Sequence, residues 1–218
     1  MSFFDINNVI FTILGYDLNG LELLGFITGI IAIYLASCGR VLNFVIGLLN
    51  CAIYFAIFFQ SNLYSMMLLQ LIFVGINVYG ILKWTMPISN DNRIEKIRIT
   101  KLSPFFCVLG IVLTILAGFV WGTYVVYLEQ KLPEYIQKPI YPLLDAMLLM
   151  GNVFGQLLLA MKKIENWYVW IVVNVVSVVL WVVLDMKLTA ILYFVYLVIA
   201  IDALRKWKRQ IILENNKN

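Results

Sequence analysis

The residues best suited to binding chemistry are two tryptophans and an asparagine in a long apolar stretch of the chain. Trp167, Trp170 and Asn174 follow one another in steps of three and four residues, so on an α-helix they share one face. Two indole rings can stack on a flat ring, or attract it when it is cationic, while the carboxamide hydrogen-bonds its polar edge. The spacing therefore favours a binding face for a small aromatic solute.

The same spacing also suits a purely structural role. Trp167 could belong to the belt of aromatic residues at a membrane surface, with Trp170 packed against a neighbouring helix. The apolar run that contains both residues continues to Leu184, which is long enough to span a bilayer as a helix. The choice between binding and packing therefore depends on what the other helices present to this face.

Further amides recur at helical spacing in the other apolar segments. Asn43, Gly47, Asn50 and Tyr54 follow one another in steps of four, three and four. A carboxamide that faces lipid is costly, so such a face points into the helix bundle or a water-filled cavity. The residues expected to line one substrate cavity are Trp167, Trp170, Asn174, Gln70, Asn50, Asn152, Gln156, Tyr193 and Tyr196.

The composition is that of a polytopic membrane protein. Of the 218 residues, 63% are hydrophobic and 13% are charged, and the mean hydropathy is +0.93. A soluble domain is nearer half apolar and a quarter charged. We predict an all-α fold with seven transmembrane helices. They are expected at about residues 21–37, 41–59, 64–84, 104–127, 140–161, 167–184 and 188–204.

Several kinds of site are not expected in this chain. It has no histidine, which removes histidine-based metal sites and catalytic triads. Its three cysteines lie in or beside apolar runs without ligand-like spacing. We therefore expect no catalytic residues, no metal, no cofactor and no enzymatic activity. The net charge of +4 concerns orientation in a bilayer rather than nucleic acid.

The basic residues predict how the chain crosses the membrane. If the polar stretch 85–103 is cytoplasmic, alternation of the spans places 13 of the 16 lysines and arginines in the cytoplasm. This agrees with the positive-inside rule. The amino terminus is then outside the cell and the carboxyl terminus is in the cytoplasm.

The first three and last three predicted helices show features in the same order. Asn50 and Asn174 lie in the second helix of each group, and Trp84 and Trp207 close the third. One connecting helix between them gives a 3+1+3 arrangement of parallel three-helix repeats, with the substrate held between the repeats. The expected segments are an N-terminal interfacial segment at 1–20, the first repeat at 21–84, a cytoplasmic loop, connector helix and outer loop at 85–139, the second repeat at 140–204 and a basic cytoplasmic tail at 205–218.

Two acids fall within predicted spans, but close to their ends. An acid inside a span can mark proton coupling. Asp145 and Asp202 both lie within reach of headgroups or water, and Asp202 could pair with Arg205 one turn on. We interpret them as paired or interfacial residues rather than as a proton relay.

These features together resemble the Pnu family of vitamin transporters and, less closely, the sugar-transporting SWEET fold. The resemblance covers about residues 20–208 and rests first on Trp167-x-x-Trp170-x-x-x-Asn174. Its other motifs are Gln70 followed by Tyr79-Gly80 and Trp84, and Arg40-x-x-Asn43 leading to Gly47 and Leu63-Tyr64. It implies facilitated diffusion of an unphosphorylated vitamin precursor, nicotinamide riboside, across a bacterial inner membrane. It also implies a functional link to a cytoplasmic kinase, whose phosphorylated product cannot leave the cell.

The residues themselves are compatible with nicotinamide riboside, which has a pyridinium ring, a carboxamide and ribose hydroxyls. No basic cluster lies within a span to hold a phosphate, so the nucleotide fits less well. Thiamine is also a flat cation, relatives carry thiamine or riboflavin, and a small sugar stays a more distant alternative. A membrane-embedded enzyme or an assembly scaffold explains the aligned amides less well. The expected partners are a small vitamin and the lipid bilayer, and the chain is compatible with a homo-oligomer.

Overall fold

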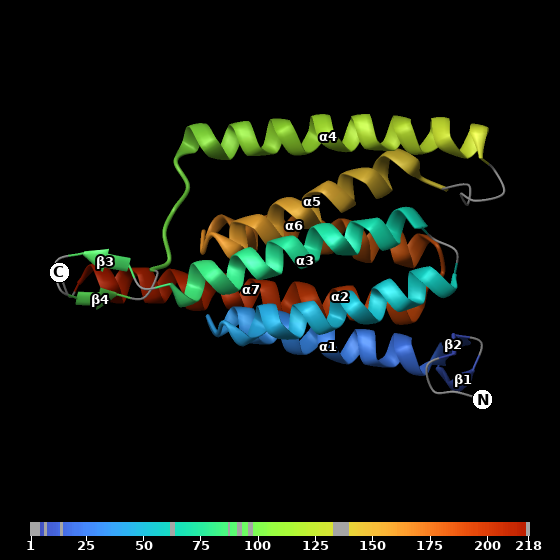
Figure 1. The fold of residues 1–218 in the computed structure, drawn as a ribbon, viewed down its shortest axis with the longest axis horizontal. Coiled ribbons are helices and arrows are strands. Elements are labelled where there is room, and N and C mark those ends of the chain that lie inside the picture. Colours follow the sequence, from blue (N-terminus) through green and yellow to red (C-terminus); the bar gives the residue numbers. More distant parts are fainter. Residues whose placement is uncertain are drawn as a thin grey trace.

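The computed structural model describes residues 5–6, 8–13, 15–61, 64–86, 88–90, 93–95, 98–132 and 140–216. Seven helices make up most of this described part, and two short hairpins accompany them (Figure 1). The helices are α1 (Gly20–Ser37), α2 (Leu42–Gln60), α3 (Tyr64–Thr85), α4 (Pro104–Lys131), α5 (Pro142–Ala160), α6 (Glu165–Val183) and α7 (Lys187–Asn215). The predicted helical fold is confirmed, and most boundaries lie within a few residues of those expected.

Six of the described helices, all except α3, are long and apolar enough to cross a membrane. The described apolar part of α3 is the shorter stretch Leu69–Thr85. The whole of α3 nevertheless has 22 residues, which extend for about 33 Å at 1.5 Å per residue, close to the thickness of a bilayer core. The chain is therefore a multi-span membrane protein.

Three segments differ in detail from the sequence-based expectation. The N-terminal segment contains an antiparallel hairpin of β1 (Val9–Ile13) and β2 (Tyr16–Asn19), and the polar loop contains a second hairpin, β3 (Ile88–Asn90) with β4 (Arg93–Glu95). The basic tail is largely helical, because α7 continues through it to Asn215. The outer loop was expected to begin after about residue 127, but α4 continues to Lys131, and the rest of the expected loop at 133–139 lies outside the described residues.

The first hairpin passes directly into α1 through a capping box. The Asn19 side chain accepts a hydrogen bond from the Glu22 backbone N–H at 2.9 Å, and the Glu22 carboxylate accepts one from the Asn19 N–H at 3.3 Å. Such a reciprocal pair satisfies two backbone donors that a helix start leaves unpaired. The β1–β2 hairpin is thereby held over one end of the bundle, which we call the hairpin end.

Six helices form a closed ring, and α4 lies outside it. Neighbours in the ring follow the order α1, α2, α3, α5, α6, α7 and back to α1, while α4 packs on α5 (Figure 1). The buried residues of α4 are Gly118 and Gly122. A Cβ at Gly118 would lie 2.8 Å from the Met147 sulfur, so the absence of a side chain allows this close approach. Helix α4 therefore takes no part in the ring.

The opposite end of the bundle holds an aromatic core around Trp84 and Trp207, and we call it the tryptophan end. Trp84 meets Phe44 edge-on with ring centroids 5.0 Å apart, and Trp207 meets Trp167 in the same way at 5.5 Å. The two central indoles are 6.3 Å apart. Edge-to-face pairs of this kind add to the stability gained from burial.

Two hydrogen bonds at the tryptophan end join the helices α1–α3 to the helices α5–α7. The Trp84 indole N–H donates to the carbonyl oxygen of Ala160 at 3.0 Å, and the Trp207 indole N–H donates to that of Ser37 at 3.2 Å. In each case a tryptophan on a third helix bonds the last residue of the first helix of the other group. Ser37 and Ala160 have the same sequence separation as the two tryptophans, so the two bonds are equivalent.

The short breaks after α1 and α5 are also alike. Gly39 and Lys162 both have a positive φ, 65° and 55°, in the left-handed region that glycine adopts most easily. The Asn43 side chain then donates to the Arg40 carbonyl, and the Asn166 side chain donates to that of Lys163. Asn43 therefore corresponds to Asn166 in the two groups, a correspondence that was not expected from the sequence.

Candidate functional site

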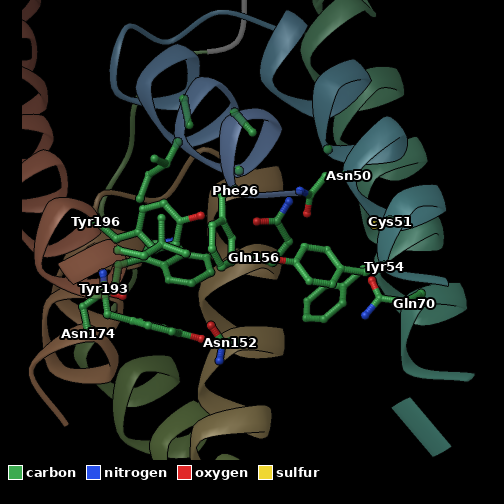
Figure 2. Close-up of a pocket in the computed structure, with 18 of the residues that line it drawn as sticks. Phe26, Asn50, Cys51, Tyr54, Gln70, Asn152, Gln156, Asn174, Tyr193 and Tyr196 are labelled. Carbon is green, nitrogen blue, oxygen red and sulfur yellow. The ribbon is translucent and has the colours of Figure 1, made fainter. Parts of the chain in front are cut away.

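A large cavity lies inside the ring of six helices. Its volume is about 590 Å³, within the range of about 300–1,000 Å³ that is usual for small-molecule sites. The described residues that line it come from β2 and from all the helices except α4. Figure 2 shows amide and aromatic side chains from several helices around this common space.

All nine side chains expected at a substrate site line this cavity. They are Trp167, Trp170 and Asn174 on α6, Asn152 and Gln156 on α5, Asn50 on α2, Gln70 on α3, and Tyr193 and Tyr196 on α7. The closed ring brings them together, because every one of these helices turns its polar face inward. A ligand in the cavity would therefore be surrounded by amides and aromatic rings.

The two tryptophans of α6 differ in their surroundings. Trp170 is partly buried and packs close to α5, since a Cβ at Gly155 would lie 3.2 Å from its ring. Trp167 is fully buried, meets Trp207 edge-on, and its indole N–H has no hydrogen-bond partner. Trp167 thus belongs to the aromatic core at the tryptophan end. Trp170 is less buried and exposes more of its ring to the cavity.

Asn174 presents an unpaired donor. Its side chain is only 2% exposed, and its Nδ2 has no hydrogen-bond partner within the described part of the chain. A buried donor without an acceptor costs about 1–3 kcal/mol. An acceptor on a bound solute would remove this cost, so the amide is suited to ligand recognition.

Two of the other amides, on α2 and α5, donate hydrogen bonds to the protein. Asn50 donates from Nδ2 to the Gly25 carbonyl at 2.9 Å and to the Thr28 hydroxyl at 2.8 Å, both on α1. Asn152 donates to the Leu148 carbonyl at 2.8 Å. These bonds orient the side chains and leave their carbonyl oxygens to accept hydrogen bonds from hydroxyl or amide groups.

The tyrosines of α7 form an aromatic wall. Tyr193 stacks on Trp181 with centroids 6.3 Å apart and meets Tyr196 edge-on at 5.8 Å. A Cβ at Gly29 would overlap the Tyr196 hydroxyl, so the glycine on α1 allows α7 to approach. Flat solutes can pack on such a wall by offset stacking.

Several lining residues were not among the expected site residues. Asn77 is buried, donates to the Phe73 carbonyl at 2.9 Å and accepts a bond from Gln156 at 3.0 Å. Its position seven residues after Gln70 on one helix face was a usable signal. Phe26 and Phe73 also line the cavity, but apolar side chains in an apolar helix carry no such signal.

Charged groups are scarce in the cavity. Glu22 is the one charged residue among the described lining residues, and its Oε1 accepts a hydrogen bond from the Tyr16 hydroxyl at 3.1 Å. Burial, together with the charge of Glu22, raises the pKa of Tyr16 from 10.0 to about 12. The Tyr16 hydroxyl therefore stays protonated and continues to donate to Glu22 at neutral pH.

The acids within the spans lie elsewhere. Neither Asp145 nor Asp202 belongs to the described lining of the cavity. Asp202 pairs with Lys206 at 2.6 Å rather than with Arg205, and both side chains of this pair are about half exposed. The predicted pairing of Asp202 with Arg205 was wrong. Residues three and four apart on a helix can both meet, and here the residue four apart, Lys206, forms the pair.

The fold and the cavity define a multi-span helical membrane protein with a solute-sized chamber at its centre, the architecture of a small-molecule transporter. Residues 19–209 match the model of the family described as nicotinamide mononucleotide transporter, and the chain belongs to that family. The Pnu resemblance seen in the sequence is thereby confirmed.

Two curated relatives, the nicotinamide riboside transporters PnuC of Escherichia coli and Shigella flexneri, are each 30% identical to this chain. Each match covers 95% of this chain and 94% of the relative. A PnuC of Neisseria mucosa is 24% identical over 72% of this chain and 57% of its own length. A crystal structure of the vitamin B3 transporter PnuC shares the fold, with a TM-score of 0.65 at 22% identity, and the match covers 87% of this chain and 81% of that one.

Proposed function

We propose that this chain carries nicotinamide riboside across a bacterial inner membrane by facilitated diffusion. The observation that carries the proposal is the set of nine amide and aromatic side chains around one cavity of about 590 Å³. Relatives named nicotinamide riboside transporters match the chain over nearly its whole length. Family and cavity therefore support the same class of solute.

The cavity chemistry suits each part of this solute. The pyridinium ring can stack on Trp170 or on the tyrosine wall, where a cation–π contact contributes about 0.5–2 kcal/mol. The carboxamide oxygen of the solute can accept the unpaired N–H of Asn174, and the ribose hydroxyls can donate to the oxygens of Asn152 and Asn50. We propose that the nine expected residues form the substrate-binding site, with Trp167 supporting it from the aromatic core.

The absence of a phosphate partner favours the riboside over the mononucleotide. None of the described residues that line the cavity is a lysine or an arginine. A buried phosphate needs charge-assisted hydrogen bonds from such groups, and burying its charge unpaired is very costly. The mononucleotide named in the family's description therefore fits this cavity less well than the riboside, which carries no phosphate.

The driving force we propose is capture after transport. A cytoplasmic kinase phosphorylates the riboside, and the charged product cannot return through the cavity. This scheme needs no coupled ion, in keeping with the position of Asp145 and Asp202 away from the cavity. The transporter and the kinase are then linked through the solute alone.

Alternating access follows from the arrangement of the helices. We propose a 3+1+3 plan in which α1–α3 and α5–α7 are parallel repeats. The contacts α1–α2, α2–α3 and α3–α5 have counterparts in α5–α6, α6–α7 and α7–α1, as a two-fold relation requires. Rocking of one repeat against the other would open the hairpin end and the tryptophan end in turn.

The proposed orientation places the hairpin end outside the cell and the tryptophan end in the cytoplasm. It rests on the excess of basic residues on the expected cytoplasmic side. Arg205, Lys206, Lys208 and Arg209 on the last part of α7 belong to that side. A homo-oligomer stays a prediction, as does the division of the chain into the five expected segments.

Binding to the purified protein tests the proposed substrate. Nicotinamide riboside, thiamine, riboflavin and glucose would be titrated separately, with tryptophan fluorescence as the signal and calorimetry as the check. We expect saturable binding of nicotinamide riboside alone, and its loss on Trp170→Ala, because the stacking surface is removed. Binding of thiamine instead would support the same class of transporter, with thiamine as its substrate. Binding of glucose alone, or of none of the four, would overturn the vitamin proposal.

Protection of a cavity thiol gives a second test. Cys51 is 5% exposed and lines the cavity, whereas Cys38 and Cys107 lie outside it. With Cys38→Ser and Cys107→Ser in place, nicotinamide riboside at ten times its Kd should slow labelling of Cys51 by a maleimide about tenfold, because about one molecule in ten remains unliganded. Labelling that is unaffected at saturation would contradict binding in this cavity. Cys51→Ser gives the background.

A further inference from the structure

A second cavity lies at the hairpin end, next to the central one. Its volume is about 400 Å³. The described residues that line it are Ile6, Val9, Asp17, Asn19, Glu22, Ile57 and Ser61. Glu22 and Ile57 line the central cavity as well. The second cavity is therefore a vestibule, and the Glu22 side chain stands where the vestibule meets the central chamber.

Among the described residues, the vestibule carries negative charge only. Asp17 and Glu22 are the charged residues among the described lining of the two cavities, and neither a lysine nor an arginine joins them there. Carboxylates in a cleft with low-dielectric walls concentrate the local field and attract cations. The path from the hairpin end to the aromatic wall is thus electrostatically biased toward positively charged solutes.

Both carboxylates are held in place by neutral donors. Glu22 accepts from the Tyr16 hydroxyl at 3.1 Å and from the Asn19 N–H at 3.3 Å, and Asp17 accepts from the Thr12 hydroxyl at 2.6 Å. These bonds orient the carboxylates without neutralising them. Each carboxylate has about four acceptor sites in all, so further contacts to a cationic solute can form.

We propose that Glu22, with Asp17 beside it, forms a vestibule site that selects solutes with a positive charge spread over an aromatic ring. The site rests on the proposed transport function and adds to it a reason for preferring a pyridinium ring over a neutral ring of the same shape. The solute meets the vestibule carboxylates first and then moves to the aromatic wall and the amides. Glu22 acts as a specificity-determining residue through its charge.

The structural role of Glu22 can be separated from its charge. In the capping box the side chain needs only a hydrogen-bond acceptor, and glutamine serves there as well as glutamate. In Glu22→Gln the single side-chain oxygen can keep the cap on α1 by accepting from the Asn19 N–H, and the side-chain NH2 can donate to the Tyr16 hydroxyl, while the negative charge is removed. A change in selectivity in this variant reports the charge rather than the fold.

The experiment compares uptake of nicotinamide riboside with uptake of its dihydro form, which keeps the carboxamide and the ribose but has an uncharged ring. Proteoliposomes with the parent protein should carry the cationic form with the lower KM. In Glu22→Gln the KM for the cationic form should rise about tenfold, with the KM for the dihydro form unchanged. Salt should raise the KM for the cation in the parent protein and have less effect in the variant. Asp17→Asn should act in the same direction with a smaller change.

Asp185→Asn is the matched control. Asp185 follows α6 at the hairpin end, is exposed, pairs with Lys187 at 3.4 Å and lines neither cavity. Its loss removes the same charge and should leave both KM values as they are. An equal rise for both solutes in Glu22→Gln, or no rise for the cation, would overturn the vestibule site. Failure of the parent protein to carry nicotinamide riboside would instead overturn the proposed function.

Discussion

Replacing Asn174 by leucine should weaken nicotinamide riboside binding strongly, while the empty protein becomes no less stable. The buried Nδ2 of Asn174 has no partner, so leucine, which is of similar size, removes an unpaired donor from the empty protein. The ligand then loses its hydrogen bond to this amide. A loss of about 1–3 kcal/mol corresponds to roughly 5–150-fold in Kd. Calorimetry gives the affinity, and thermal unfolding in detergent gives the stability.

Asn77→Leu is the control for this prediction. Asn77 is buried to a similar degree, but it donates to the Phe73 carbonyl and accepts from Gln156. Its replacement leaves the Gln156 N–H without this acceptor, although the Phe73 carbonyl keeps its place in the backbone bonding of α3, so the empty protein should lose about 1–3 kcal/mol of stability. If Asn174→Leu destabilises the empty protein as much as Asn77→Leu and leaves the affinity intact, Asn174 has a packing role and no part in binding.

Replacing Trp84 and Trp207 by phenylalanine should loosen the tryptophan end. Each indole N–H bonds a carbonyl of the opposite helix group, Ala160 and Ser37, so phenylalanine keeps an aromatic ring but leaves that carbonyl unpaired. We expect each variant to lose about 1–3 kcal/mol of stability. Because the two rings are 6.3 Å apart, the effects should not be additive in the double variant.

The rate at which a maleimide labels Cys51 reports how often the tryptophan end opens. In inside-out membrane vesicles of the Cys38→Ser, Cys107→Ser protein, a membrane-impermeant maleimide meets the expected cytoplasmic face first. If the two bonds break whenever this end opens, each phenylalanine variant should be labelled about tenfold faster, which is the effect of roughly 1.4 kcal/mol. Trp121→Phe on α4, outside the ring, is the matched control. Loss of stability with unchanged labelling would mean that the bonds stabilise the fold without holding this end closed.

The sequence by itself determined the helices and which of their faces point inward. Lipid offers no hydrogen bonds, so the amides of Asn50, Gln70 and Asn152 must face the interior whatever the details of packing. Helical periodicity then places Trp170 and Asn174 on the same inward side of α6. For this reason all nine expected residues line one cavity, although nothing in the sequence states which helices are neighbours.

Only the tertiary structure decided what each inward side chain does. The contact of α3 with α5 pairs Asn77 with Gln156, while Asn174 keeps an unpaired donor, and both asparagines look alike in the sequence. Trp167 became part of the aromatic core because Trp207 packs against it. Glu22 came to lie between two cavities because the β1–β2 hairpin folds over α1. Contacts between distant segments depend on how whole helices pack, and local residue patterns do not encode that packing.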